Sequence, residues 1–218
     1  MKKLLSGLVF IGILLVASCY KPDVPGSYNS LGNANAVGSN PTNPSTCTYA
    51  PYRLGSKMTQ KDSNGAVRNY EVIKDTTIGT EKYFMFLNKS NNNFESYIGV
   101  DTAGNVWQYT PAVNLGGVSI PATKLIYLKP KEPVNATWST TLSNGSTYEF
   151  KIVQKGISQT INGTNYTNGI KVNLKLSTTI AGSTITTSDA DYLYFCGFGY
   201  YSLTQGGVEV SKVTSFTY

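Results

Sequence analysis

Residues 147–176 read TYEFKIVQKGISQTINGTNYTNGIKVNLKL. Every second residue in 148–152 and in 170–176 is apolar or aromatic, and the residues between them are charged or polar. A period of two places one side of an extended chain on a core and the other in water. The intervening pair Asn162–Gly163 is typical of tight hairpin turns, because both residues tolerate a positive φ. This stretch therefore predicts two antiparallel strands.

The rest of the chain after about residue 47 follows the same plan. Residues 82–87, KYFMFL, are more continuously apolar, as expected of a central strand. Short apolar runs alternate with turn signals, and no convincing helical period is present; the main turn signals lie at 62–65, 91–93, 103–105, 143–146 and 162–165. This spacing predicts an all-β, antiparallel fold of about ten to twelve strands, arranged as a strongly curved sheet, a sandwich or a half-barrel.

Two segments interrupt the pattern. Residues 111–121 contain two prolines and a Gly-Gly pair, which predicts a long loop. Residues 129–133, KPKEP, then break the pattern again, because proline cannot donate to a strand ladder. The domain at 47–218 could divide here into halves at 47–128 and 134–218, and one curved sheet made of both halves is the favoured interpretation.

The composition excludes several chemistries. The sequence contains no histidine, which removes Ser-His-Asp and Cys-His catalysis and zinc sites built on histidine. Charged residues make up 14%, well below the usual share of about 25%. The net charge is +6, but the basic residues are scattered and form no aromatic-interleaved stripe, so no nucleic-acid partner is expected.

The N-terminus is typical of an export signal. Lys2 and Lys3 precede an apolar run at 4–16, which is shorter than the roughly 20 residues that span a bilayer as a helix. The next residues, Val-Ala-Ser-Cys at 16–19, resemble the lipobox of bacterial lipoproteins. That resemblance implies a signal peptide at 1–18 and a mature chain that begins at Cys19. The cysteine would carry acyl chains, palmitate among them, that anchor the chain in the outer membrane on its periplasmic face or at the cell surface.

Residues 19–46 would then form the anchor and a flexible tether, since they are rich in Pro, Gly, Ser and Asn and contain few large apolar side chains. Further along, DTTIGTEKYFMF, DTAGNVWQY and DYLYFCGFGYY follow one another in that order. Over about 49–218, the chain resembles a group of uncharacterised all-β secreted proteins and lipoproteins of the Bacteroidota. The resemblance implies a fold and a location in the cell envelope, and it brings no activity with it.

Two cysteines remain once Cys19 is acylated. Cys47 and Cys196 would sit in an oxidising compartment, which favours a disulfide between them. The alternative is a pair of buried, reduced thiols.

Few residues suggest catalysis or metal binding. Asp189 and Asp191 are two apart and share one face if extended, so they could serve a carboxylate-based hydrolase or, as a weak candidate, a calcium site. An ordinary strand turn is the favoured interpretation. No serine-nucleophile or phosphate-binding motif is present. We therefore expect a protein that is not an enzyme and that uses no cofactor.

Surface modification and aromatic contacts are the remaining candidates. Asp75-Thr76-Thr77 and Asp101-Thr102-Ala103 resemble the O-glycosylation acceptor motif of exported Bacteroidota proteins, and both triplets are expected near turns. Residues 192–201 read as one aromatic strand, and Trp107, Tyr200 and Tyr201 are the leading candidates for exposed binding rings, although core packing is the commoner role of such rings. Three functions remain open: a non-enzymatic envelope module that binds a glycan or a protein partner, a carrier of a lipid or other apolar ligand, and a hydrolase.

Overall fold

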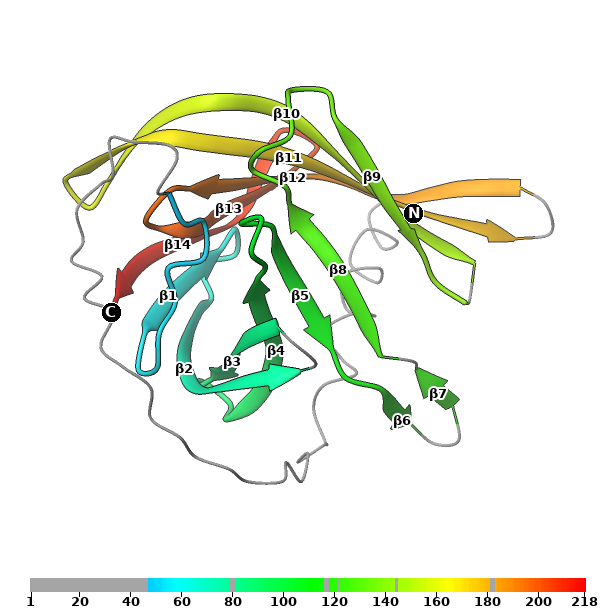
Figure 1. Cartoon of the computed structure of the whole chain (residues 1–218), viewed down its shortest axis with the longest axis horizontal. Coiled ribbons are helices and arrows are strands. Elements are labelled where there is room, and N and C mark those ends of the chain that lie inside the picture. Colours follow the sequence, from blue (N-terminus) through cyan, green and yellow to red (C-terminus); the bar gives the residue numbers. More distant parts are fainter. Residues whose placement is uncertain (1–46, 79–80, 116–117, 121, 144, 181–182) are drawn as a thin grey trace.

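The computed structural model describes residues 47–218 apart from 79–80, 116–117, 121, 144 and 181–182. The expected signal peptide, the Cys19 anchor and the tether lie outside the described residues. The described part contains fourteen β-strands and no helix, so none that could cross a membrane. Twelve of the strands form a single antiparallel, strongly curved sheet, and two form a separate hairpin (Figure 1). The all-β prediction is confirmed.

The strands are β1 (Lys57–Asp62), β2 (Val67–Ile78), β3 (Glu81–Asn88), β4 (Asn93–Val100), β5 (Val106–Thr110), β6 (Val113–Leu115), β7 (Val118–Ile120), β8 (Thr123–Leu128), β9 (Thr137–Thr141), β10 (Ser146–Ile161), β11 (Thr164–Ile180), β12 (Ser183–Phe195), β13 (Gly199–Gln205) and β14 (Val208–Thr217).

The order in the large sheet is β8-β5-β4-β3-β2-β1-β14-β13-β12-β11-β10-β9. Neighbours in this sheet are consecutive in the chain except at two places. The β6–β7 hairpin is inserted between β5 and β8, and the first strand, β1, pairs with the last, β14. The two free edges, β8 and β9, are consecutive strands, and the proline-rich segment 129–133 lies in the connection between them. Residues 47–128 and 134–218 thus contribute to the same sheet, on either side of the β1–β14 pairing.

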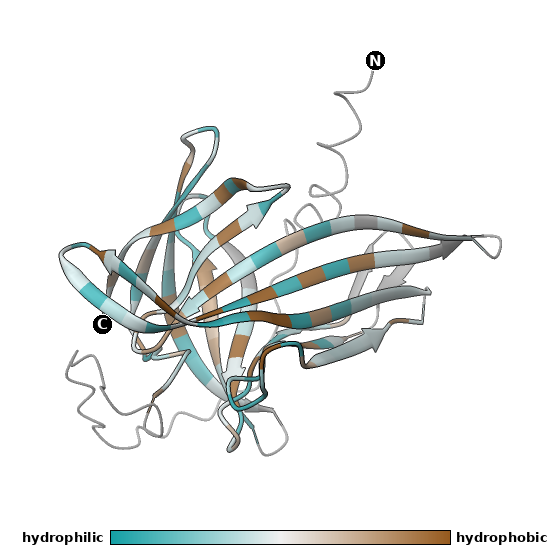
Figure 2. Ribbon diagram, turned by 90° about the horizontal axis from the view of Figure 1, so that it is seen from above, coloured by the Kyte–Doolittle hydropathy of each residue, from teal (hydrophilic) through white to brown (hydrophobic). Residues whose placement is uncertain are grey.

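Alternation along the long strands explains their burial. Phe150 and Ile152 are completely buried, whereas Glu149 and Lys151 between them are exposed. The same alternation of apolar and polar residues is visible along the long strands in Figure 2. The predicted turn at Asn162 (φ 49°) and Gly163 (φ 81°) joins β10 to β11, with both residues left-handed, as a tight hairpin requires.

Two local predictions were wrong. Residues 111–121, expected as a loop, contain the β6–β7 hairpin, because short apolar segments on both sides of the Gly-Gly pair can extend and pair. Residues 192–201 are two strands rather than one. The chain reverses between β12 and β13, where Gly197 (φ 74°) and Gly199 (φ 92°) adopt the left-handed conformation.

The N-terminal segment of the described chain fills part of the concave face. Tyr52 is buried, and its ring makes edge contacts with Phe84, Phe86 and Phe216 at centroid distances of 6.4, 4.8 and 5.8 Å. Gly199 is needed here, because a Cβ at this position would lie 2.8 Å from the Tyr52 hydroxyl. The segment before β1 is therefore an integral part of the core.

Candidate functional site

Five tyrosines from four strands converge on the concave face of the sheet. They are Tyr127 on β8, Tyr148 on β10, Tyr192 and Tyr194 on β12, and Tyr200 on β13, and we call them the tyrosine cluster. Ring centroids lie 5.5 Å apart for Tyr127–Tyr192, 6.2 Å for Tyr192–Tyr200 and 5.9 Å for Tyr194–Tyr200. Four of the five rings are thus joined by successive ring contacts, and Tyr148 packs against the same core.

The curvature of the sheet brings this cluster together. β8 is at one end of the strand order and β12 is well inside the other half, yet Tyr127 of β8 contacts Tyr192 of β12 and Phe150 of β10. Side chains also link the two free edges, since the Trp138 Nε1–H of β9 donates to the Ile126 carbonyl of β8 at 2.6 Å. The Trp138 ring is in turn stacked on Phe150 (5.6 Å, 7° between planes).

The cluster is not sealed. Tyr127, Tyr148, Tyr192 and Tyr200 are only half-buried, so solvent reaches part of each side chain. The Tyr200 hydroxyl is hydrogen-bonded to Ser211 Oγ at 3.0 Å. The other four hydroxyls make no hydrogen bond within the described residues. Among those residues, Trp107 Nε1 is the one fully buried polar side-chain atom without a partner, so the four hydroxyls must border accessible space.

The electrostatic environment keeps the cluster neutral. Burial raises the pKa of Tyr127 and Tyr194 well above the ordinary value of 10, and neighbouring tyrosines raise it further. The pKa values of Tyr192 and Tyr200 shift in the same direction, again mainly through burial. The buried polar residues of the described part are all uncharged: Ser56, Asn88, Ser96, Ser202 and Ser211. At neutral pH, this face therefore offers hydroxyl donors and acceptors and ring surface.

Charged side chains lie beyond one end of the cluster. Ser211, which holds the Tyr200 hydroxyl, also accepts a hydrogen bond from Gln60 Nε2 at 2.8 Å. The same serine borders a cavity of about 230 Å³ whose other lining residues are Lys61, Asp62, Ser63, Glu209 and Lys212. Lys212 is paired with Glu209 at 2.9 Å in this cavity.

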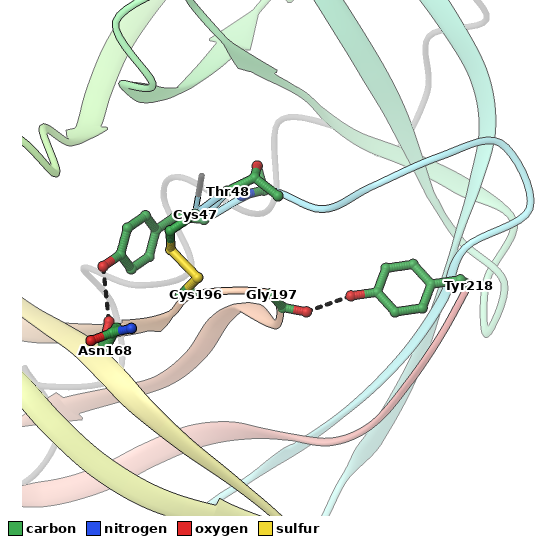
Figure 3. The surroundings of a disulfide bond; sticks show 8 residues. Cys47, Thr48, Asn168, Cys196, Gly197 and Tyr218 are labelled. Atoms are coloured by element: carbon green, nitrogen blue, oxygen red, sulfur yellow. Dashed lines mark hydrogen bonds between the residues drawn. A yellow bond between two sulfur atoms is a disulfide. The ribbon is translucent and has the colours of Figure 1, made fainter. Parts of the chain in front are cut away.

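The predicted disulfide is confirmed. Cys47 is bonded to Cys196, with 5.5 Å between the Cα atoms (Figure 3). The backbone N–H of Gly197 donates to the Thr48 carbonyl at 2.8 Å, and the Tyr218 hydroxyl donates to the Gly197 carbonyl. These contacts fix the start of the described chain to the β12–β13 turn.

A cavity of about 430 Å³ lies beside the disulfide. Its lining includes Cys47, Thr48, Tyr49, residues 100–104, Pro130, Lys131, Lys155, Gly156, Asn168 and Ile170. Much of its polar lining is already engaged by the protein. The Lys155 ammonium donates to the carbonyls of Pro130 (2.8 Å) and Glu132 (3.1 Å), and the Tyr49 hydroxyl donates to the Asn168 carbonyl (2.8 Å). The tyrosine cluster is therefore the stronger candidate for a binding site.

The prediction of Trp107 as an exposed ring was wrong. Trp107 is 1% exposed and packs on the opposite face of the sheet in a second cluster, the outer aromatic cluster, with Tyr83 and Tyr97. A Cβ at Gly99 would lie 2.5 Å from its ring, so the missing side chain at Gly99 makes room for the indole. Lys124 Nζ lies 4.1 Å from the Trp107 ring centroid and is paired with Glu81 at 2.6 Å.

Tyr200 and Tyr201, the other two predicted rings, lie on opposite faces. Tyr200 belongs to the tyrosine cluster, whereas Tyr201 packs against Phe195 and Phe198. Both side chains are half-buried. Sequence reasoning did not select Tyr127 or Tyr148, although the inward alternation of 148–152 was a signal for the latter.

Asp189 and Asp191 do share one face, as their spacing predicts. Both carboxylates accept a hydrogen bond from the Asn173 side-chain amide, at 2.7 and 2.9 Å. Within the described ranges, no three His, Cys, Asp or Glu side chains come together as a metal site would require. The amide contact accounts for the position of both aspartates.

The two threonine motifs differ in setting. Thr102 is exposed in the turn between β4 and β5, as expected. Thr76 is half-buried within β2, where it pairs with Tyr83 of β3, so its expected position at a turn was wrong. The acidic-threonine motif at 75–77 falls in a strand because its β-branched residues continue the preceding extended run.

No protein-family model matches the chain, and no curated protein is significantly similar to it. Two solved structures are similar. One is a "putative lipoprotein" from Parabacteroides distasonis, with 13% identity and a TM-score of 0.46 over 78% of this chain and 99% of that one. The other is a "putative exported protein with YmcC-like fold" from Bacteroides fragilis, with 10% identity and a TM-score of 0.48 over 79% of this chain and 100% of that one. Both come from the Bacteroidota, and similarities of this size imply nothing about activity or ligand.

Proposed function

We propose that this chain is a non-enzymatic, lipid-anchored protein of the cell envelope whose β domain binds a ligand on its concave face. The observation that carries the binding role is the tyrosine cluster, in which four of the five residues are half-buried, all are uncharged, and four hydroxyls have no hydrogen-bond partner within the described residues. Unpaired polar groups next to apolar ring surface are typical of small-molecule sites.

The envelope location is supported by the sequence at 1–19, where a basic start, an apolar run and a lipobox-like cysteine follow one another. Acylation at Cys19 would anchor the chain in the outer membrane, and the segment to residue 46 would act as a tether. Replacement of Cys19 by Ala is expected to release the protein from the membrane fraction. Unchanged partitioning of this variant would rule out the anchor.

A second candidate function is a carrier of a lipid or other apolar ligand. It is favoured by the apolar side chains that surround the tyrosine cluster on the concave face, among them Leu125, Phe150 and Val172. Both candidates use the same face, and they differ in whether the ligand must hydrogen-bond to the tyrosine hydroxyls.

Native mass spectrometry of the chain, gently extracted from its own membranes, tests the binding site. We expect the wild-type protein to retain a non-covalent adduct that a Tyr127→Ala, Tyr192→Ala double variant loses. Tyr201→Ala serves as the control, because Tyr201 lies in the same hairpin but on the other face. The proposal is overturned if the wild type carries no adduct or if all three proteins carry the same one.

A further inference from the structure

The hydroxyls of the tyrosine cluster limit what the ligand is. An acyl chain laid over Tyr127, Tyr148, Tyr192 and Tyr194 would exclude water from four hydroxyls that have no partner within the described residues. Each hydroxyl would lose its hydration and gain no hydrogen bond, which opposes binding. A ligand that carries its own hydroxyl groups would satisfy them.

The charges limit the ligand further. Burial keeps the tyrosines protonated, and the buried polar side chains of the described part are serines and an asparagine. Two charged groups lie at the margins of this face. Lys129 Nζ is 5.4 Å from the Trp138 ring centroid. At the β13–β14 end, the negative charge of Glu209 contributes to the raised pKa of Tyr200. A charged ligand held between them would lose its hydration without a counter-charge at the centre of the site.

The aromatic rings add an apolar surface that the ligand can contact. The ring planes of Tyr127 and Tyr192 meet at 69°, and those of Tyr194 and Tyr200 at 65°, so the cluster presents both ring surface and hydroxyl groups along one wall. A sugar has the matching chemistry, since its C–H groups are apolar and its hydroxyls both donate and accept hydrogen bonds.

We propose that the ligand of the tyrosine cluster is an uncharged saccharide, held by ring contacts and by hydrogen bonds to the hydroxyls of Tyr127, Tyr148, Tyr192 and Tyr194. This inference rests on the proposed function, because it assigns a ligand class to the same concave site. It also separates the two candidate functions: a saccharide needs the hydroxyls, whereas an apolar ligand binds better without them.

The test replaces hydroxyls and keeps rings. Titration calorimetry of the mature chain would use neutral hexasaccharides of glucose, mannose and galactose, with oligogalacturonate as the charged counterpart and N-phenyl-1-naphthylamine as an apolar probe. We expect a neutral hexasaccharide to bind, and its affinity to fall about tenfold in a Tyr127→Phe, Tyr192→Phe double variant, as for the loss of two modest hydrogen bonds. Tyr201→Phe, on the other face, should bind as the wild type does.

Three outcomes overturn the inference. The first is binding of the apolar probe that tightens in the Tyr127→Phe, Tyr192→Phe variant, with no neutral saccharide bound; the ligand class is then wrong while the binding site stands. The second is equal binding of the acidic and neutral oligosaccharides. The third is failure of every neutral hexasaccharide to bind at millimolar concentration. The proposed function itself falls only with the mass-spectrometric result described above.

Discussion

The tyrosine cluster and the outer aromatic cluster are built from the same residue types on opposite faces of one sheet. In the outer aromatic cluster, Trp107 and Tyr83 are 1% and 2% exposed, and the Tyr83 hydroxyl donates to Glu81 at 3.2 Å. The Lys124–Glu81 pair lies against it, with the ammonium over the indole. In the tyrosine cluster, most rings are half-buried, and four hydroxyls are unpaired within the described part of the chain.

This difference shows that aromatic content does not mark a site. The outer aromatic cluster is closed by the Lys124–Glu81 ion pair, which accepts a hydrogen bond from Tyr83 and covers Trp107, so the cluster behaves as a small core. The tyrosine cluster has comparable ring contacts, and within the described residues no ion pair covers it. Exposure distinguishes the two: the unpaired Trp107 Nε1 of the outer aromatic cluster is fully buried, whereas the unpaired hydroxyls of the tyrosine cluster border accessible space. This difference cannot be read from a list of tyrosines.

The largest loss of stability is expected when the Cys47–Cys196 disulfide, on the concave side, is removed. A Cys47→Ser, Cys196→Ser variant removes a bridge between residues 149 apart in sequence. In the chain-entropy account, a loop of this size is worth about 5 kcal/mol of unfolding free energy. Urea unfolding would measure this loss, and hydrogen exchange should quicken around 47–56 and the β12–β13 turn before the outer aromatic cluster. An unchanged urea midpoint would contradict the prediction.

The next effect concerns the outer aromatic cluster. Trp107→Ala leaves a large cavity beside Tyr83 and Gly99, and such truncations typically cost about 3–5 kcal/mol. The folded fraction should still carry the ligand of the concave face, because Trp107 lies on the other side of the sheet. Urea unfolding and native mass spectrometry on the same sample check both statements. Loss of the adduct from folded protein would show that the two faces are coupled.

The third effect is a loss of folding stability at alkaline pH, caused by a buried tyrosine on the concave side. Burial raises the pKa of Tyr52 from 10 to about 12, so the folded state keeps a proton that the unfolded state releases above pH 10. Stability is therefore complete below pH 10 and falls as the pH rises to 12, by roughly 3 kcal/mol for this residue at 1.36 kcal/mol per pKa unit. Tyr52→Phe should flatten this part of the curve in urea unfolding measured from pH 9 to 12. Equal slopes for both proteins would refute the assignment to Tyr52.

The smallest changes in stability are expected when single tyrosine hydroxyls are removed from the two clusters. Tyr83→Phe removes a partly buried hydrogen bond to a carboxylate and should lower the free energy of unfolding by about 1.5 kcal/mol, the lower end of the usual range for bonds to charged groups. Tyr127→Phe removes a hydroxyl without a partner among the described residues and should change the free energy of unfolding by less than about 0.5 kcal/mol. Similar losses in both variants would mean that the two clusters do not differ as described.

Local alternation was enough to predict the strands. The burial of Phe150 and Ile152 and the hairpin at Asn162–Gly163 follow from period and turn chemistry alone. The link between Cys47 and Cys196 followed from the count of cysteines in an exported chain. These features depend on residues close in sequence or on covalent chemistry, which a single sequence carries.

The candidate site depends on the curvature of the sheet, which brings β8 close to β12 and which local sequence patterns do not reveal. Tyr127 lies in a short apolar run that gives no sign of its contact with Tyr192, because the contact exists only when β8 curves over β12. Trp107 and Tyr109 are two residues apart and pack in the same cluster, but the cover over Trp107 comes from Glu81 and Lys124, which are far apart in the chain. The sequence alone therefore could not predict which aromatic cluster is accessible to solvent.

The pairing of the first strand with the last sets an order of events when the chain is made. β1 emerges early, but the edge that β14 covers has no partner until the final ten-residue strand, Val208–Thr217, is available. Contacts of such long sequence separation form late and slowly. The disulfide of Cys47 also cannot form until Cys196 has been made. A chain that stops short of β14 would present the open edge of β1 to other molecules, so β14 protects this edge against edge-to-edge association.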